Sequence, residues 1–367
     1  SLDVDFYRLQ LEIGERVNLE MSSEKNILVN DPGADSSVSA FTQSETSMVK
    51  FGNTVLVGYN DSGSTTNGNK FTGYSISRDG GQTFTDMGEL PTNANGDSGD
   101  PVLARDETNG TIYFATLTGT GGPIEVFRSF DDGDKFTAPV SATPGKTAFQ
   151  DKPWMAVDNA PGVGQGNVYL TATDVATTTE ITFFSSTDGG SSYGPSGGTT
   201  IATGTVQGSW ITVGADHTVY VFYHDATAFP QTIKMRKSTD FGATFSTAVV
   251  VQALNTTGTN GSLGLTVSAS DPSQVRSNAF PQVIMNPVND DLYMTYTDNP
   301  FGGDKADVYF TMSSDGGTTW SGPTRVNSDS SPNDQWQASI AVTPNGQNVG
   351  VFWYDRRQSA DNSMIEY

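Results

Sequence analysis

Carboxylate and aromatic side chains recur at the starts and ends of short strand-like runs in this sequence. Glu45, Asp61 and Asp355 are carboxylates of this kind, and two carboxyl groups across a pocket can hydrolyse a glycosidic bond. We treat these three as catalytic candidates. Aromatic rings with amides and carboxylates also bind neutral sugars, by stacking and by hydrogen bonds to hydroxyl groups. Residues in similar positions that could bind such a ligand are Asp100, Asp151, Lys152, Trp154, Trp210, His224, Asp225, Asp298, Trp336, Arg356 and Arg357.

The charge of the chain restricts its partners. There are 41 acidic and 19 basic residues, with a formal net charge of −22. This balance argues against nucleic acid, because phosphate backbones bind basic surfaces, and equally against anionic membranes. No apolar run of 18 residues occurs, so we expect no insertion into a membrane. The carboxylates and tryptophans instead favour a glycan or polysaccharide as the partner.

Most of the acidic excess fits solubility in salty or extracellular conditions. Ca²⁺ is a second explanation, because it prefers carboxylate and carbonyl oxygens. The acidic clusters that could hold it contain Asp97, Asp100, Asp131, Asp132 and Asp134. Two histidines do not favour a zinc site, and His224 beside Asp225 is either a base or a structural residue. No phosphate loop, dinucleotide fingerprint or nucleophile elbow occurs, so we expect no organic cofactor.

An octapeptide of the form Ser-x-Asp-x-Gly-x-Thr-aromatic, with some variation at the Thr position, occurs five times. Its copies begin at Ser77, Ser129, Ser186, Ser238 and Ser313, and successive starts lie 52, 57, 52 and 75 residues apart. A four-stranded blade needs about 40–50 residues, so each step holds one blade with its loops. Glycine permits the positive φ of a chain reversal, and the aspartate can accept N–H groups within the turn. We therefore assign a structural role to Asp79, Asp131, Asp188, Asp240 and Asp315.

Two strand-like runs lead up to each copy, which itself joins two further strands, and this predicts an all-β fold. A sixth blade begins at 336–342 and reaches 363–367, one strand short of four. Residues 26–30 are similar to the outer strand of blade five at 324–328, so we expect them to complete the last blade and remove an exposed sheet edge. The prediction is a six-bladed β-propeller of four-stranded antiparallel blades over residues 25–367, closed by an N-terminal strand.

The octapeptide resembles the Asp box of the sialidase-like (BNR-repeat) superfamily, over roughly residues 25–367. The resemblance implies a propeller whose five boxes lie on the face opposite the active site. A sialidase also needs three arginines for the sugar carboxylate, a Tyr–Glu pair and an Asp acid. Blade one has Ser44-Glu45-Thr46-Ser47 where the family's Phe-Arg-Ile-Pro signature would open the innermost strand. We therefore expect a sialidase-like propeller that recognises or processes glycans but lacks true sialidase activity.

The alternative function is a non-catalytic structural or adhesive module of a cell-surface or secreted protein. The absence of cysteine fits an oxidising compartment, where unpaired thiols are a liability, and we expect a secreted or cell-surface location. Residues 1–24 fit no blade, and 3–11 with Gly14 are similar to part of a bacterial pre-peptidase C-terminal domain. This resemblance implies a remnant of a preceding β-domain and a monomer within a larger multidomain chain. An ordinary strand packed on the propeller is the other interpretation of residues 1–24.

A long insertion at 254–277 separates blades four and five. Connections longer than about 15 residues are uncommon and often functional. The insertion is rich in Asn, Thr, Gly and Ser, so it is either a mobile lid over the ligand or a solvated loop.

Overall fold

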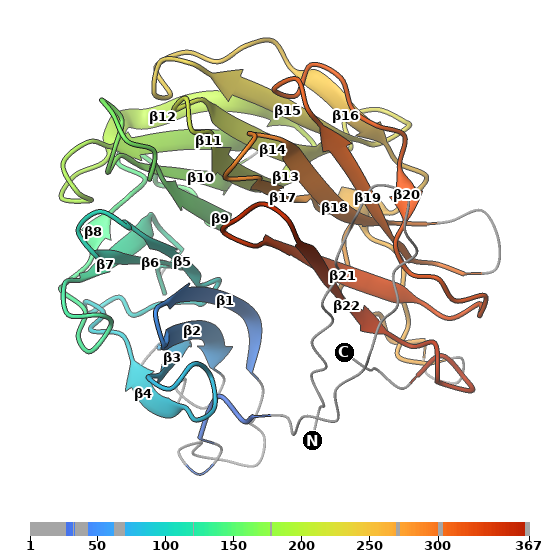
Figure 1. The fold of residues 1–367 in the computed structure, drawn as a ribbon, viewed down its shortest axis with the longest axis horizontal. Coiled ribbons are helices and arrows are strands. Elements are labelled where there is room, and N and C mark those ends of the chain that lie inside the picture. The colour runs from blue at the N-terminus through green and yellow to red at the C-terminus, as the bar shows by residue number, and fades with distance from the viewer. Residues whose placement is uncertain are drawn as a thin grey trace.

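A computed structural model describes residues 27–31, 33, 43–61, 70–119, 121–176, 178–268, 272–299 and 304–363. Within them the chain forms a β-propeller: five four-stranded antiparallel sheets and one two-stranded sheet, set around a common axis (Figure 1). Each four-stranded sheet is a meander in chain order. The strands β1, β5, β9, β13, β17 and β21 lie nearest the axis, and the last strand of each four-stranded sheet lies at the periphery (Figure 1).

The bounds of the strands, blade by blade, are β1 Gln43–Phe51, β2 Thr54–Asp61, β3 Thr72–Ser77 and β4 Thr85–Glu89; β5 Val102–Arg105, β6 Ile112–Leu117, β7 Ile124–Ser129 and β8 Val140–Ser141; β9 Gln150–Val157, β10 Val168–Val175, β11 Thr179–Ser186 and β12 Gly194–Gly204; β13 Val206–Val213, β14 Val219–Asp225, β15 Thr232–Ser238 and β16 Val249–Ala253; β17 Gln282–Met285, β18 Leu292–Asp298, β19 Asp307–Ser313 and β20 Thr324–Arg325; and β21 Gln335–Val342 and β22 Val349–Asp355.

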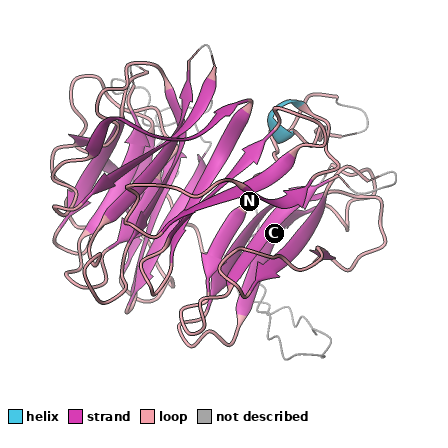
Figure 2. Cartoon of the chain, turned by 90° about the horizontal axis from the view of Figure 1, so that it is seen from above, coloured by secondary structure: helices cyan, strands magenta, loops and turns pink. Residues whose placement is uncertain are grey.

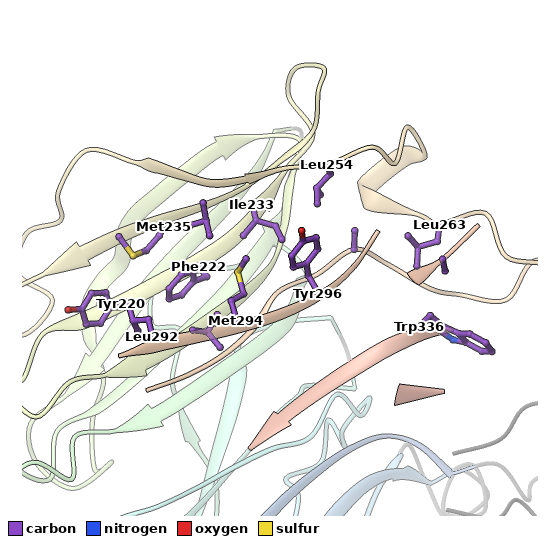
Figure 3. Packing of buried hydrophobic residues seen from close by; sticks show 14 of the residues in the cluster. Tyr220, Phe222, Ile233, Met235, Leu254, Leu263, Leu292, Met294, Tyr296 and Trp336 are labelled. Carbon is purple, nitrogen blue, oxygen red and sulfur yellow. The ribbon is translucent and has the colours of Figure 1, made fainter. Parts of the chain in front are cut away.

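The hydrophobic core is divided into layers between neighbouring sheets, which stand face to face (Figure 2). The second strand of each four-stranded blade is buried on both faces, as near-continuous apolar runs such as 112–115 require. The largest layer lies between blades four and five, where Phe222, Ile233, Met294 and Tyr296 are in contact (Figure 3). Burying a side chain of this size contributes about 1.5–3 kcal/mol, so the contacts between blades hold the ring together.

The sixth sheet differs from the predicted blade. Only β21 and β22 form it among the described residues. The predicted third strand was 363–367; Ser363 belongs to no strand, and 364–367 lie outside the described residues. Residues 27–31 belong to no strand, so their predicted pairing with blade six is wrong for the described part of the chain. In the described structure this segment contacts blade one: Val29 packs on Val55 and Val57, and the Asp31 N–H donates to the Asp86 carboxylate (2.9 Å). The predicted segment 1–24 also lies outside the described residues.

The five octapeptides form the hairpin turns at the outer edge of the five four-stranded blades. In the first, the Ser77 hydroxyl donates to Asp79 Oδ1 (2.8 Å) and accepts the N–H of Gly81 (2.9 Å). Asp79 Oδ1 also accepts the N–H of Thr83 (2.9 Å), and Asp79 Oδ2 accepts its hydroxyl (2.7 Å). These bonds, with the hydroxyl of Thr83 as the main cause, lower the pKa of Asp79 to about 2. The structural role assigned to the aspartate therefore has a direct geometric basis.

The second octapeptide lacks one of these bonds, because Lys135 stands where the other copies have Thr or Ser. The Lys135 N–H still donates to Asp131 Oδ1 (3.0 Å), and this bond is the main cause of the lowered pKa of Asp131. In the fifth copy the Thr319 hydroxyl donates to Asp315 Oδ2 (2.5 Å) and lowers the pKa of Asp315 to about 2.

Replacing Thr319 by Val should therefore destabilise the protein in a pH-dependent way. A carboxyl whose folded pKa is depressed stabilises the fold above its unfolded pKa, about 3.9, and loses that contribution as pH falls toward the folded value. We expect a lower unfolding temperature for Thr319→Val at pH 7 and a difference that shrinks below pH 4, measured by circular dichroism. The reciprocal change Lys135→Thr should raise the unfolding temperature at pH 7. An equal effect of Thr319→Val at every pH would contradict this account.

The insertion at 254–277 is packed on the blades in its described part, so it is not a solvated loop there, and the mobile lid stays a prediction. Leu263 and Leu265 are buried in the layer between blades four and five. Asp298 accepts the N–H groups of Asn255 (2.9 Å) and Thr256 (2.9 Å), which fixes the start of the insertion to the end of β18. A short 3₁₀ turn, Thr259–Gly261, follows. None of the helical segments in the described residues is long and apolar enough to span a membrane.

Candidate functional site

A cavity of about 180 Å³ lies where the innermost strands begin. We call it the mouth cavity; its polar lining includes Glu45, Asp100, Lys152, Ser209, Asn278 and Gln337. In each four-stranded blade the end of the second strand pairs with the start of the first strand and with the start of the third strand. In blade one, for example, Asn60 pairs with Ser44 and with Thr72. The octapeptide turns follow the other end of the third strand. The mouth cavity and the octapeptides therefore lie at opposite ends of the blades.

Two carboxyl groups surround one ammonium group in the mouth cavity. Lys152 Nζ lies 2.6 Å from Glu45 Oε2 and 3.8 Å from Asp100 Oδ2. Asp151, next in the chain, does not line the cavity and accepts a hydrogen bond from the Gln207 amide (2.7 Å). The three charged residues of the cavity come from blades one, two and three, so only the assembled ring brings them together.

The two carboxyl groups differ in their affinity for protons. Burial raises the pKa of Asp100 to about 8; the Lys152 ammonium opposes this shift, and the Glu45 carboxylate adds to it. Burial also opposes ionisation of Glu45, but a hydrogen bond with Asp100 and the charge of Lys152 outweigh it and lower the pKa of Glu45. The two shifts run in opposite directions, and Asp100 is the member of the pair on which burial favours the protonated form. Two titratable groups whose pKa values are pushed apart are the arrangement of an acid and a base in an active site.

Two tryptophans form an aromatic wall of the cavity. Trp154 and Trp210 are stacked, with ring centroids 3.5 Å apart and planes inclined by 22°, and both line the cavity. The Trp210 indole N–H donates to the carbonyl of Val283 (2.5 Å), which fixes the ring against the next blade. A fixed aromatic face beside carboxyl and amide groups suits the apolar face and the hydroxyl groups of a sugar ring.

The three charged residues of the mouth cavity have a strained, left-handed backbone conformation. Glu45, Asp100 and Lys152 have φ values of 51°, 54° and 47°, in the left-handed region. Glu45 and Lys152 lie in β-bulges, where the pairing of β1 with β2 and of β9 with β10 shifts its register. A residue other than glycine in this conformation costs about 1–3 kcal/mol and persists only where the surrounding structure imposes it. The bulges turn the side chains at the strand starts away from the regular alternation of the sheet.

Four candidate carboxylates occupy one repeated position outside the cavity lining, at the end of the second strand of a blade: Asp61, Asp225, Asp298 and Asp355. Each is hydrogen-bonded. Asp61 accepts from the Gln43 amide (3.2 Å), and Asp225 accepts from Lys234 Nζ (2.7 Å). Asp355 accepts from the Trp353 indole (2.9 Å) and from Arg357 Nε (2.6 Å). These contacts hold strand ends and loops together.

The arginine and tryptophan candidates of blade six also lie outside the cavity lining. Arg356 is 1% exposed; it donates to the carbonyl of Thr266 in the long insertion (2.8 Å) and lies 3.7 Å from Asp334. Its guanidinium stands over the ring of Trp336, 4.8 Å from the centroid, and Trp336 is itself buried beside Leu263 (Figure 3). Arg357 pairs with Asp355 (2.5 Å). These residues join the insertion and blade six.

His224 is completely buried. Its Nε2 contacts the Gln231 side-chain oxygen (2.9 Å), and burial lowers its pKa to about 4. It is therefore neutral near pH 7, and it does not line the mouth cavity. Of the two interpretations of this residue, the contacts favour the structural one.

The metal candidates are dispersed. Asp131 belongs to an octapeptide turn, and Asp134 pairs with Arg78 (2.5 Å). Asp97 is buried, and its Oδ1 accepts the N–H of Phe71 (2.8 Å). Asp132 adopts a left-handed turn conformation with φ 58°, and Asp100 lines the mouth cavity. In the part of the chain that the structure describes, no group of three or more Asp, Glu or His side chains could hold one ion.

Several lining residues were not among the sequence candidates, namely Ser209, Asn278 and Gln337. Ser209 is 5% exposed, and its hydroxyl has no hydrogen-bond partner among the described residues. A repeated sequence signal could have separated the strand-end carboxylates from the cavity residues. An aromatic residue two positions before Asp occurs at 59–61, 223–225, 296–298 and 353–355, which marks these aspartates as parts of the repeat.

Comparison with solved structures identifies this fold. A trans-sialidase from Ruminococcus gnavus has a TM-score of 0.57 at 11% identity, with 93% of this chain and 95% of that chain covered. An α-L-arabinanase from Penicillium chrysogenum has a TM-score of 0.54 at 14% identity, with 96% and 99% covered. The Hadza microbial sialidase Hz136 has a TM-score of 0.55 at 16% identity; 85% of this chain matches, but it spans only 63% of that protein.

Sialidases and arabinanases are thus structural neighbours of this chain, which shares their propeller fold. Neither a protein-family model nor a curated protein sequence matches it. At identities of 11–16% the likeness establishes the fold alone, and function has to be argued from the mouth cavity.

Proposed function

We propose that this protein is an extracellular, sialidase-like propeller that binds a glycan in the mouth cavity and hydrolyses a glycosidic bond there. The observation that carries the proposal is the pair of carboxyl groups, Glu45 and Asp100, around Lys152 in a cavity walled by Trp154 and Trp210. The structural neighbours include proteins that are named as sialidases and an arabinanase complexed with arabinobiose, and glycans are the ligand class these share with the proposal.

The chemistry follows from the protonation of the pair. Protonated Asp100 donates its proton to the glycosidic oxygen as the bond to the anomeric carbon breaks. Ionised Glu45 then stabilises, through its negative charge, the positive charge that develops on the sugar. Water adds its hydroxyl group to the anomeric carbon, and the second proton returns to the pair. Lys152 keeps Glu45 ionised and holds both carboxyl groups at one position.

The substrate of the proposed reaction is a glycan without a sialic acid at the bond that is cleaved. A sialic acid carboxylate needs several guanidinium groups, and among the described residues no arginine lines the cavity. Arg356 and Arg357 are engaged in blade six. We accordingly propose neutral glycans as ligands, with arabino-oligosaccharides as the first class to test.

The proposal also concerns the closure of the propeller ring and the location of the protein. Gln337 and Ala338 of β21 line the mouth cavity together with Glu45 and Thr46 of β1, so we treat the sixth sheet as a sixth blade that closes the ring. We further propose that the propeller acts as a monomer within a larger, secreted or surface-attached protein. Bound Ca²⁺ stays a proposal, to be tested by unfolding in the presence of a chelator.

Glycan binding is tested by calorimetric titration of arabinobiose and of a panel of neutral oligosaccharides. We expect Trp154→Ala to weaken binding by about tenfold or more, because it removes an aromatic surface and unstacks Trp210, and tenfold corresponds to about 1.4 kcal/mol. Phe130→Ala is the matched control, since Phe130 is 65% exposed and lies in an octapeptide turn at the other end of the blades. If no glycan binds, the non-catalytic structural module is the better description. Release of sialic acid from a sialoside would refute the exclusion of sialidase activity.

A further inference from the structure

The left-handed residues at the mouth cavity form a series with one member in each of five blades. They are Glu45, Asp100, Lys152, Gly208 and Gln337, with φ values of 51°, 54°, 47°, 65° and 56°. All five line the mouth cavity. Four of them coincide with register shifts between the first and second strands of blades one, three, four and six. Asp100 lies just before β5, the first strand of blade two.

Glycine is the least costly residue in this conformation, yet only one blade uses it. At Gly208 the reason is close packing, because a Cβ atom there would lie 2.4 Å from Cγ of Phe280. The other four blades keep a polar or charged side chain despite the strain. Backbone strain retained at one position in several blades, all around one cavity, indicates a role for the side chains that are kept.

Blade five is the exception to the series. Its first strand is preceded by Phe280 and Pro281, which also line the cavity. The proline ring fixes φ near −65°, so Pro281 cannot adopt the left-handed conformation. The Phe280 ring packs on Gly208, and together they form an apolar wall between blades four and five. The polar side chains of the series therefore approach the cavity from the blade six, one, two and three side.

Gln337 is the member of the series with no assigned role. It is exposed, and its side-chain amide makes no hydrogen bond to another described residue, whereas Glu45, Asp100 and Lys152 contact one another. An amide offers two donors and an acceptor, which suits vicinal hydroxyl groups of a sugar. It lines the same cavity from β21 but is not part of the charged group of Glu45, Asp100 and Lys152.

We propose that the left-handed residue at the start of each first strand is the ligand-contacting position of its blade, and that Gln337 is a glycan-binding residue contributed by blade six. This inference rests on the proposed function, because it specifies how the same cavity holds its ligand. It adds an uncharged hydrogen-bonding position on the sheet next to blade five, which contributes Phe280. The bound sugar would then have hydroxyl groups toward Gln337 and an apolar face toward the stacked rings of Trp154 and Trp210.

The test compares Gln337→Ala and Gln337→Gly with the matched control Asp132→Gly, by titration with arabinobiose and by thermal unfolding. Asp132 has φ 58° but lies in an octapeptide turn away from the cavity. The unfolding temperatures of both glycine variants should be about 1–2 °C above that of the wild type, because the backbone strain is relieved. Both Gln337 variants should bind arabinobiose about fivefold to tenfold more weakly, whereas Asp132→Gly should bind like the wild type.

The outcomes separate the inference from the proposed function. If Trp154→Ala loses arabinobiose binding while both Gln337 variants keep the wild-type affinity, the cavity binds glycans and the role of Gln337 is refuted. If wild-type protein binds neither arabinobiose nor any neutral oligosaccharide in the panel, the proposed function fails and the inference fails with it. Loss of binding in Gln337→Ala together with a lower unfolding temperature of Gln337→Gly would refute the strain argument.

Discussion

Asp100→Asn should reduce the rate of glycoside hydrolysis by roughly 10²–10⁴-fold, the usual contribution of a general acid. The amide occupies the same space but cannot release a proton to the leaving group. In the wild type the rate should fall as pH rises through about 8, because the pKa of Asp100 is raised to about 8 and its proton is lost there. Initial rates with an arabino-oligosaccharide, whose sugar leaving group needs protonation, measure both effects between pH 4 and 10. The alkaline decline should be absent from the residual activity of the variant.

Stability gives a second, independent measurement on the same residue. A carboxyl whose folded pKa is raised stabilises the fold fully below its unfolded pKa, about 3.9, and loses that contribution as pH rises through the folded value. Wild-type protein should therefore lose this contribution between about pH 4 and pH 8, and Asp100→Asn should not. Asp97→Asn is the control: burial raises its pKa too, but it does not line the mouth cavity. An Asp100→Asn enzyme with wild-type kinetics would refute the assignment of the acid.

Arg356→Met should lower the free energy of unfolding by about 3–5 kcal/mol, because removing one member of a buried ion pair leaves the other uncompensated. Here the partner is Asp334, and three further contacts disappear: the hydrogen bonds to the carbonyls of Thr266 and Val267 and the stacking over Trp336. For a chain of 367 residues this is a fall in unfolding temperature of roughly 4–6 °C. Thermal unfolding measures the fall, and limited proteolysis within 254–277 should become faster.

Arg357→Met is the matched control for that experiment. Its side chain is 29% exposed, and the pair it forms with Asp355 is partly solvated. We expect a loss of about 1 kcal/mol or less. Weaker glycan binding by Arg356→Met, with an unchanged unfolding temperature, would instead make Arg356 a ligand residue and would contradict its structural role.

The local parts of this fold could be predicted from the sequence because their causes are local. An octapeptide turn is determined by hydrogen bonds that span four residues, as between Asp79 and Thr83, and its five copies reveal the blade period. The closure of the ring could not be predicted in the same way. Similarity between 26–30 and 324–328 concerns strand propensity, whereas the position of 27–31 depends on a hydrogen bond to Asp86 and on packing against Val55.

The candidate site was predicted in outline, as residues at the starts and ends of strand-like runs. Which of the two positions faces the cavity depends on β-bulges and left-handed backbone, and these are not visible in residue types. Glu45, Asp100, Lys152, Trp154 and Trp210 line the mouth cavity, whereas the carboxylates at the second-strand ends are held by neighbouring donors. Gln337 was missed because its exposure and strain arise only from the bulge in β21.

The opposite placement of octapeptide turns and mouth cavity has a consequence for the order of folding. Each turn closes within eight residues, so its hairpin can form early and independently, at little cost in chain entropy. The cavity instead joins residues from Glu45 to Ala338, which lie at nearly opposite ends of the described chain. Because contacts between residues distant in sequence cost more loop-closure entropy, we expect the cavity to form after the hairpins. A polypeptide that ends before blade six could thus acquire most of its hairpins while the ligand site does not yet exist.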